Sequence, residues 1–118
     1  MHITNRVLLL GTVLEWQSVK KIIEDGILTL HFKLKTVERS LLQPPHIEYH
    51  RAVVKGALAQ KCVQNQFIAP GNILLIEGRL AKGCEHSVKY GYRDFTEIEI
   101  LELEFVHKFK LGEQQVGF

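Results

Sequence analysis

The residues of this chain that are best suited to chemistry lie in the segment 48–59. If this segment forms a strand, Tyr49, Arg51 and Lys55 lie on one face, because side chains alternate with a period of two along a strand. An exposed aromatic ring can stack on a nucleobase, and the cations beside it can contact phosphates. The pattern therefore indicates binding of a single-stranded nucleic acid.

The sequence does not predict an enzyme. It contains no phosphate-binding loop of the G-x-x-x-x-G-K-[ST] type, no H-E-x-x-H and no G-x-S-x-G motif. Four glutamates could act as paired carboxylates, but nothing places a partner acid or a nucleophile opposite them. We interpret them as a solvated strand face or a subunit contact that would repel phosphates. They are Glu97, Glu99, Glu102 and Glu104.

We expect neither a metal ion nor another cofactor. Cys84 and His86, together with Cys62 or His50, could suggest zinc, but their spacing matches no standard site. The two cysteines form no C-x-x-C pair, so we interpret them as thiols in a reducing cytosol.

The length of 118 residues fits one domain. The 46% apolar content can form a core without disulfides, and the net charge of +2 neither requires nor excludes a nucleic-acid partner. The apolar run after Arg6 is short and has no small-residue cleavage site, and no stretch approaches the ~20 apolar residues of a membrane span. We expect a cytoplasmic protein that does not contact a membrane.

Hydrophobic periodicity predicts five strands and one helix that must position these side chains. The third strand contains the binding segment, and the strand before it alternates clearly, with Leu28, Leu30, Phe32 and Leu34 inward. The helix precedes a Pro70-Gly71 stop. The predicted strands cover residues 4–16, 27–36, 48–55, 72–82 and 93–106, and the helix covers 57–67 with Ala59, Val63 and Phe67 on its apolar face.

Several local features refine this pattern. Both faces of the first strand are apolar, so it is buried on two sides or serves two sheets, with a bend at Gly11. Residues 17–26 are polar and end in an Asp25-Gly26 turn. Residues 83–92 are expected to form a long loop, and the alternation slips between Ile100 and Leu101, which predicts a β-bulge.

The order strand, strand, strand, helix, strand, strand is that of an OB-fold, an all-β, five-stranded Greek-key barrel with a helix between strands three and four. Periodicity alone supports only a small β-barrel. The assignment rests on the element order together with the resemblance described next. We expect the OB-fold domain to span residues 1–106 and a short C-terminal tail to span 107–118.

Three segments of the chain resemble the bacterial single-stranded DNA-binding proteins in their order and spacing. They are residues 5–13, 48–59 and 71–80. The resemblance implies an OB-fold and a base-stacking role for Tyr49. Other stacking positions of that family are occupied by Ser40, Lys55 and Glu85 in this chain, where Tyr90, Tyr92 and Phe95 are the candidate substitutes. The acidic C-terminal tail of the family is absent.

The chain is also similar to the primosomal replication protein N, a tail-less relative of that family. This resemblance covers the opening residues 4–7 and implies that lysines after strand four, here Lys82 and Lys89, contact DNA. The relative forms dimers and the tailed family forms tetramers, in both cases by pairing barrels through the first strand. We therefore expect a homo-oligomer, either a dimer or a tetramer.

The predicted binding surface combines strands two and three with the loops after strands one and four. Lysines on an exposed strand can also be merely solubilising, Tyr49 can be a cross-strand packing residue, and Trp16 can belong to the core. The gathering of basic and aromatic residues on one face favours binding. The predicted DNA contacts are Trp16, His31, Lys33, Lys35, Tyr49, Arg51, Lys55, Lys82, Lys89, Tyr90, Tyr92 and Arg93, with Lys20 and Lys21 as further cations of the first loop.

These features predict sequence-independent single-stranded DNA binding in replication, repair or recombination, in a protein associated with the nucleoid. A primosome accessory protein that helps restart replication through a helicase shares the same fold and DNA contacts. From another class, an OB-fold module could bind proteins through its acidic fifth strand. RNA binding also stays open, because stacking and phosphate contacts do not distinguish RNA from DNA.

Overall fold

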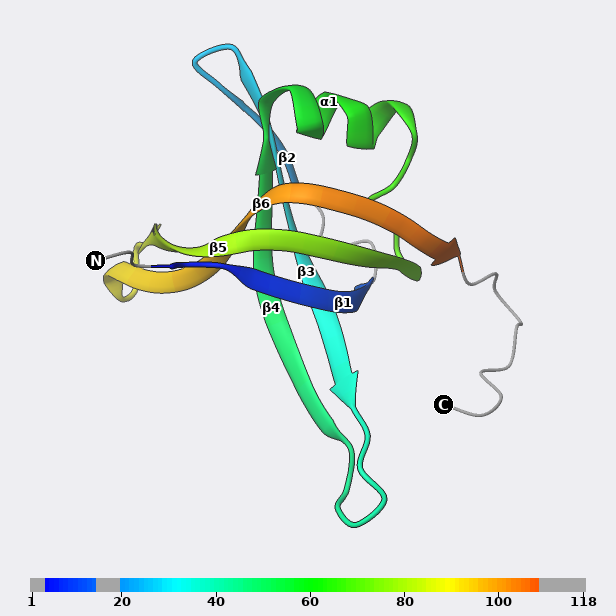
Figure 1. Ribbon diagram of the computed structural model, residues 1–118. Coiled ribbons are helices and arrows are strands. Elements are labelled where there is room, and N and C mark those ends of the chain that lie inside the picture. The colour runs from blue at the N-terminus through cyan, green and yellow to red at the C-terminus, as the bar shows by residue number, and fades with distance from the viewer. Residues whose placement is uncertain (1–3, 15–19, 109–118) are drawn as a thin grey trace.

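The computed structural model describes residues 4–14 and 20–108 of the chain. Long strands joined in hairpins make up most of it, and one short helix lies at one end (Figure 1). The elements are β1 (Val7–Val13), β2 (Lys20–Glu24), β3 (Ile27–Glu38), β4 (His46–Lys55), α1 (Gly56–Gln64), β5 (Asn72–Ser87) and β6 (Gly91–Lys108).

Five strands close into a barrel in the order β1-β5-β6-β4-β3, and pairing of β1 with β3 completes the ring. The antiparallel hairpins β3–β4 and β5–β6 supply most of the pairing, whereas β4 and β6 are parallel and share only two residue pairs. The pairs that join the two hairpins and close the ring are Ala52–Ile98, Val53–Glu99, Thr12–Lys35 and Val13–Leu34. With the helix between the third and fourth barrel strands, this arrangement confirms the predicted OB-fold.

The inward positions of β3 form the centre of the core. Leu30, Phe32 and Leu34 are buried, as the alternation predicts, and they pack with buried residues of the other barrel strands. Thr29 is also buried, although the alternation assigns it to the outward side of β3, and Ile22 of β2 lies directly opposite it. Thr29 does not belong to the hydrophobic core, so the core lies on the inward side of β3.

The helix covers one end of the barrel but is shorter than predicted. Ala59 and Cys62 are buried against the core, whereas Val63 is exposed and does not belong to the buried face. The chain leaves the helix through Gln66, whose φ of 54° lies in the left-handed region. Phe67 therefore lies beyond the helix, where its ring stacks on Phe105 with centroids 5.9 Å apart.

The first strand is not buried on two sides, because Leu8 and Leu10 are exposed, and it has two neighbours within one closed sheet instead of serving two sheets. It pairs with β5 from Val7 to Thr12, and near its end it also pairs with β3. Gly11 lies at this switch, where a Cβ atom would come within 3.0 Å of the Lys35 carbonyl oxygen. The close approach explains why a residue without a side chain suits this position.

Residues 17–26 are not only a polar loop. Lys20 to Glu24 form β2, which pairs with the start of β3 and leaves the barrel as an edge extension. Asp25 and Gly26 both have positive φ, 49° and 77°, which is the backbone of a two-residue turn that suits a β-hairpin. The turn agrees with the prediction, whereas the strand before it differs from the expected polar segment.

The expected long loop at 83–92 is instead the end of a hairpin. β5 continues through Ser87 and β6 begins at Gly91, so only three residues connect the strands. In the barrel, Gly78 pairs with Ile100 and Glu77 with Glu102, which leaves Leu101 unpaired. This confirms the predicted β-bulge between Ile100 and Leu101.

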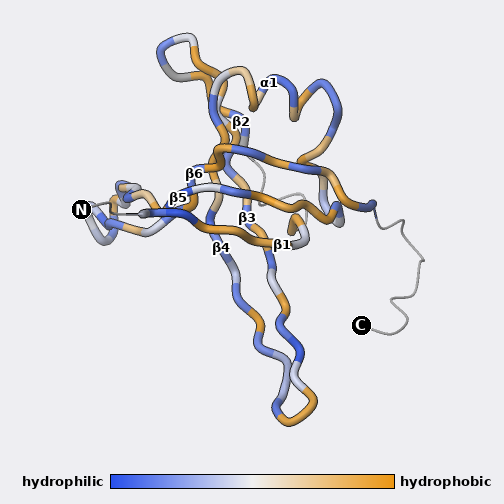
Figure 2. The backbone as a smooth tube through the Cα atoms, viewed as in Figure 1, coloured by the Kyte–Doolittle hydropathy of each residue, from blue (hydrophilic) through white to orange (hydrophobic). Residues whose placement is uncertain are grey.

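Both hairpins extend past the barrel as arms. The β3–β4 arm is mostly hydrophilic along its length and ends in a hydrophobic tip, where Leu41 and Leu42 are exposed (Figure 2). β6 continues through Lys108, two residues past its predicted end, and the rest of the expected tail lies outside the described residues.

Candidate nucleic-acid interface

The outer face of the β3–β4 hairpin brings predicted site residues together in register. Lys33 lies directly opposite Arg51, and Lys35 lies directly opposite Tyr49. Tyr49 is 61% exposed, so its ring is available to a ligand. The two cross-strand pairs place one aromatic ring among three cations on adjacent strands, the combination that stacks bases and contacts phosphates.

Farther along the same face the arrangement changes. Val53, two residues after Arg51, is 1% exposed, and it pairs with Glu99 of β6. His31 lies opposite Val53 and is half-buried, and Lys55 lies beyond it, at the start of the helix. Lys55 is therefore separated from the Tyr49 cluster by a buried position.

Arg51 is held by the β5–β6 hairpin. Its guanidinium carbon lies 4.1 Å from the centre of the Phe95 ring, and its Nη1 lies 3.4 Å from Glu85 Oε2. The Phe95 ring covers Gly83, the residue directly opposite on β5, where a Cβ atom would overlap the ring. The second hairpin thus crosses beside the outer face of β4 and places an aromatic ring and a carboxylate on Arg51.

Arg93 belongs to the face of the β5–β6 hairpin that contacts Arg51. It lies two residues before Phe95 on β6, so the two side chains point to the same side of the hairpin. Glu85 lies directly opposite Arg93. Arg93 is therefore close to a carboxylate on the same face that carries the Arg51 contacts.

Lys82 and Tyr92 lie on the other face of this hairpin. Tyr92 alternates with Arg93 and packs on His86, with ring centroids 4.7 Å apart and planes inclined by 55°. Lys82 shares the side of His86, because both occupy alternate positions of β5. The structure therefore separates Lys82 and Tyr92 from the Arg51 contacts.

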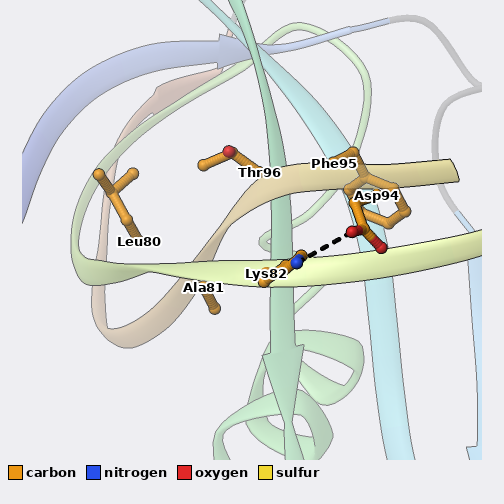
Figure 3. Close-up of a pocket in the computed structure, with 6 residues that line it drawn as sticks. All are labelled: Leu80, Ala81, Lys82, Asp94, Phe95 and Thr96. Carbon is orange, nitrogen blue, oxygen red and sulfur yellow. Dashed lines mark ion pairs between the residues drawn. The ribbon is translucent and has the colours of Figure 1, made fainter.

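Lys82 lines an open hollow at the base of this hairpin (Figure 3). Its Nζ forms an ion pair of 2.9 Å with Asp94 Oδ2, drawn as the dashed line in the figure. The hollow is lined by Leu80, Ala81, Lys82, Asp94, Phe95 and Thr96. A phosphate that binds Lys82 must therefore compete with a carboxylate that is already in contact.

The turn of the β5–β6 hairpin carries the remaining predicted loop residues. The Ser87 hydroxyl oxygen accepts hydrogen bonds from the backbone N–H groups of Lys89 and Tyr90, at 3.2 and 3.3 Å. Lys89 Nζ lies 5.3 Å from the centre of the exposed Tyr90 ring. The turn thus presents a cation and an aromatic ring side by side at the end of the arm.

The predicted first-loop contacts are only partly described. Trp16 lies outside the described residues. Lys20 and Lys21 lie in β2, and Lys21 pairs with Leu30, an inward position of β3. Register therefore assigns Lys21 to the side of β2 that is opposite to the Tyr49 face.

Sequence reasoning did not predict the contacts that three residues make at this surface. Phe95 lies in the predicted fifth strand and Glu85 in a segment expected to be a loop, and both contact Arg51. Asn5 forms two hydrogen bonds of 2.9 Å with the backbone of Leu80, where β5 leaves the barrel. Asn5 belongs to the segment 5–13 that carries the resemblance, and the sequence offers no other sign of its structural role.

A second surface, distinct from the Tyr49 face, lies across β1, β5 and β6 in the barrel. Leu8 is 69% exposed and pairs with Glu77, which in turn lies directly opposite Glu102. Two carboxylates at directly opposite positions repel each other. The shallow hollow at this place is lined by Leu8, Leu75, Glu77, Glu102, Leu103 and Glu104, so it is both apolar and acidic.

The two cysteines considered as zinc ligands differ in their exposure to solvent. Cys62 is buried in α1, whereas Cys84 is exposed on β5. Among residues 4–14 and 20–108, no cluster of three or more histidine, cysteine or acidic side chains is arranged to hold a metal ion. In the same part of the chain, no helix has the length and apolar content to span a membrane.

No protein-family model and no curated protein matches this sequence. The fold, however, is similar to that of a solved structure described as the Plasmodium falciparum SSB in complex with single-stranded DNA. The two chains align with a TM-score of 0.70 and 20% sequence identity, over 91% of this chain and 98% of the other. Over nearly its whole length, this chain therefore has the OB-fold of that SSB.

Proposed function

We propose that this protein binds single-stranded DNA without sequence preference. The observation that carries the proposal is the exposed Tyr49 ring, in register with Lys35 and next to the Arg51–Lys33 pair. The fold similarity to an SSB described in complex with single-stranded DNA supports it independently. Every base has a face that can stack on Tyr49, so such a surface is tolerant of sequence.

The expected energetics combine stacking with phosphate contacts. Each stacked base contributes about 1–3 kcal/mol, and each phosphate contact releases counterions, so affinity falls with salt. Lys33 and Lys35 flank the ring and are the phosphate contacts nearest to it. Duplex DNA hides its base faces in the stack, so it cannot use Tyr49 in this way.

A fluorescence titration with a labelled oligo-dT at low and high salt tests the proposal. We expect tight, salt-sensitive binding to the single strand and weak binding to a duplex of the same length. Absence of binding to oligo-dT even at low salt would overturn it. A parallel titration with oligo-rU decides between DNA and RNA, and equal affinity for the two would replace the DNA assignment by single-stranded nucleic acid in general.

We also propose that the protein is a homo-oligomer that pairs through β1. Leu8 and Leu10 are exposed on the outer side of this strand, and a pair of large aliphatic side chains in water favours burial against a second copy. Sedimentation of Leu8→Asp should show a smaller species than the wild type. Leu41→Asp, which adds the same charge at the exposed tip of the β3–β4 arm, should leave the size unchanged.

The cellular process follows from the partner proteins. A role in replication, repair or recombination requires only coverage of single strands, whereas a role in replication restart requires contact with a helicase or another primosome protein. Pull-down with the purified candidate helicase, with and without oligo-dT, separates these two roles. Retention of the helicase without DNA would favour the restart role.

A protein-interaction module is the second candidate. The apolar and acidic hollow between β1, β5 and β6 favours it, because Glu77 and Glu102 oppose each other and would gain from a basic partner. If this candidate is right, the protein does not bind oligo-dT even at low salt. The titration with oligo-dT therefore discriminates between the two functions.

A further inference from the structure

We propose that Arg51, held on Phe95, is a second base-stacking platform next to Tyr49 and not chiefly a phosphate contact. The inference rests on the proposed single-stranded DNA binding and assigns a further subsite to the same surface. It is carried by the contacts of Arg51 with Phe95 and Glu85 and by the glycine beneath the Phe95 ring.

The position of Arg51 suits a stacking role. Arg51 follows Tyr49 by two residues on β4, so both side chains point to the same face, about 7 Å apart along the strand. A guanidinium group is planar, and bases stack on it as they do on aromatic rings. A strand of nucleic acid that stacks one base on Tyr49 therefore meets a second planar group next along β4.

The β5–β6 hairpin supports the guanidinium from one side. Phe95 lies 4.1 Å below the guanidinium carbon, and its own ring fits over Gly83 because that residue has no side chain. Glu85 contacts one end of the guanidinium at 3.4 Å and limits its rotation. These contacts come from both strands of the second hairpin, so Arg51 is oriented before any ligand arrives.

Arg51 stays accessible despite these contacts. Its side chain is 40% exposed, which leaves part of the guanidinium open to a base. Its charge is already shared with Glu85 and with the Phe95 ring, which reduces its value for a phosphate. Lys33, directly opposite, has no ion pair in the described part of the chain and is free to bind the phosphate. Arg51 thus contacts a base, and Lys33 contacts the phosphate.

Arg51→Lys is the discriminating variant, because it keeps the charge and removes the plane. We expect it to lower the affinity for oligo-dT about fivefold or more, with an unchanged dependence on salt. Phe95→Leu, which keeps apolar volume and removes the ring, should cause a similar loss, and combining the two should add little. Lys33→Ala is the matched control, and it should reduce the salt slope by about 0.7.

An abasic oligomer provides the second arm. Without bases there is nothing to stack, so Arg51→Lys and the wild type should bind it equally. If Arg51→Lys matches the wild type on oligo-dT and Arg51→Ala only reduces the salt slope, Arg51 is a phosphate contact and the platform is overturned. In that case binding by the wild type keeps the proposed function intact, whereas a wild type that binds no oligo-dT at low salt overturns both. Thermal unfolding of each variant verifies that it is folded.

Discussion

Asn5 continues the pairing of β1 with β5 through its side chain. Its Nδ2 donates a hydrogen bond to the Leu80 carbonyl oxygen, and its Oδ1 accepts one from the Leu80 N–H, both at 2.9 Å. Backbone pairing of the two strands reaches Val7 and Gly78. The amide therefore ties the start of the chain to the point where β5 leaves the barrel for its arm.

We expect Asn5→Ala to lower the free energy of unfolding by about 1–2 kcal/mol, since each lost hydrogen bond contributes about 0.5–1.5 kcal/mol. Arg6→Ala is the control, because within residues 4–14 and 20–108 the Arg6 side chain donates to the Asn5 backbone oxygen alone, and the change should alter stability by less than about 0.5 kcal/mol. Urea unfolding of both variants measures the difference. Equal stability of the two would show that the side-chain pairing contributes nothing.

Tyr49→Ala should weaken binding to oligo-dT by about 5- to 150-fold, which corresponds to the 1–3 kcal/mol of one stacked base. Tyr49→Phe keeps the ring and should retain most of the affinity. The salt dependence should be the same in both variants, because neither loses a cation. An alanine variant that binds as well as the wild type would exclude stacking on this strand.

Asp94→Asn should strengthen binding, because it releases Lys82 from an ion pair on the arm. The exposed pair stabilises the fold by at most about 1 kcal/mol, so the melting temperature should change little. If the freed lysine gains a phosphate, the salt slope steepens by about 0.7.

Glu104→Gln is the control for overall charge, since Glu104 lies on the apolar and acidic surface across β5 and β6. It removes the same charge without releasing Lys82. An equal gain in affinity from both variants would mean that net charge, and not the ion pair, limits binding.

The two cysteines should differ in reactivity. Burial raises the pKa of the Cys62 thiol above its ordinary value of 9.0, and the positive charge of Lys61 offsets this only in part. Cys84 is exposed. A thiol reagent at pH 8 should therefore label Cys84 quickly and Cys62 slowly, and Cys84→Ser should remove the fast phase. Two equal rates in the wild type would contradict the burial of Cys62.

The raised pKa also predicts how stability depends on pH. The unfolded chain loses the Cys62 proton near pH 9, whereas the folded chain keeps it to higher pH, so stability falls as pH rises above about 9. Urea unfolding at pH 8 and pH 10 measures this fall. Cys62→Ala lacks the titrating group, so its stability should fall less over the same interval.

The sequence predicts the barrel well where one face of a strand is buried. Leu30, Phe32 and Leu34 alternate with polar residues because β3 has the core on one side, and the slip at Leu101 marks the bulge for the same reason. The segment with Tyr49 and Arg51 is placed correctly on an outer face by alternation alone.

The two missed strand regions lie outside the barrel. Residues 83–87 and 91–92 include no buried side chain, so no apolar alternation marks them. β2 is a five-residue edge strand, whose pairing depends on the turn and not on burial. The contact of Arg51 with Glu85 joins residues 34 positions apart, and only the folded hairpins bring them together.

The short closures of the barrel have a consequence for its motion. All ten residues of β4 pair with β3 and all sixteen of β5 pair with β6. Among the described residues, the two hairpins are joined by two pairs between β4 and β6 and, through β1, by two pairs between β1 and β3. The molecule therefore consists of two extensively paired hairpins that are joined to each other by short stretches of strand pairing. We expect the short β4–β6 and β1–β3 pairings to open before either hairpin loses its own pairing. The two arms can then tilt relative to each other and adjust their separation to the bound single-stranded DNA.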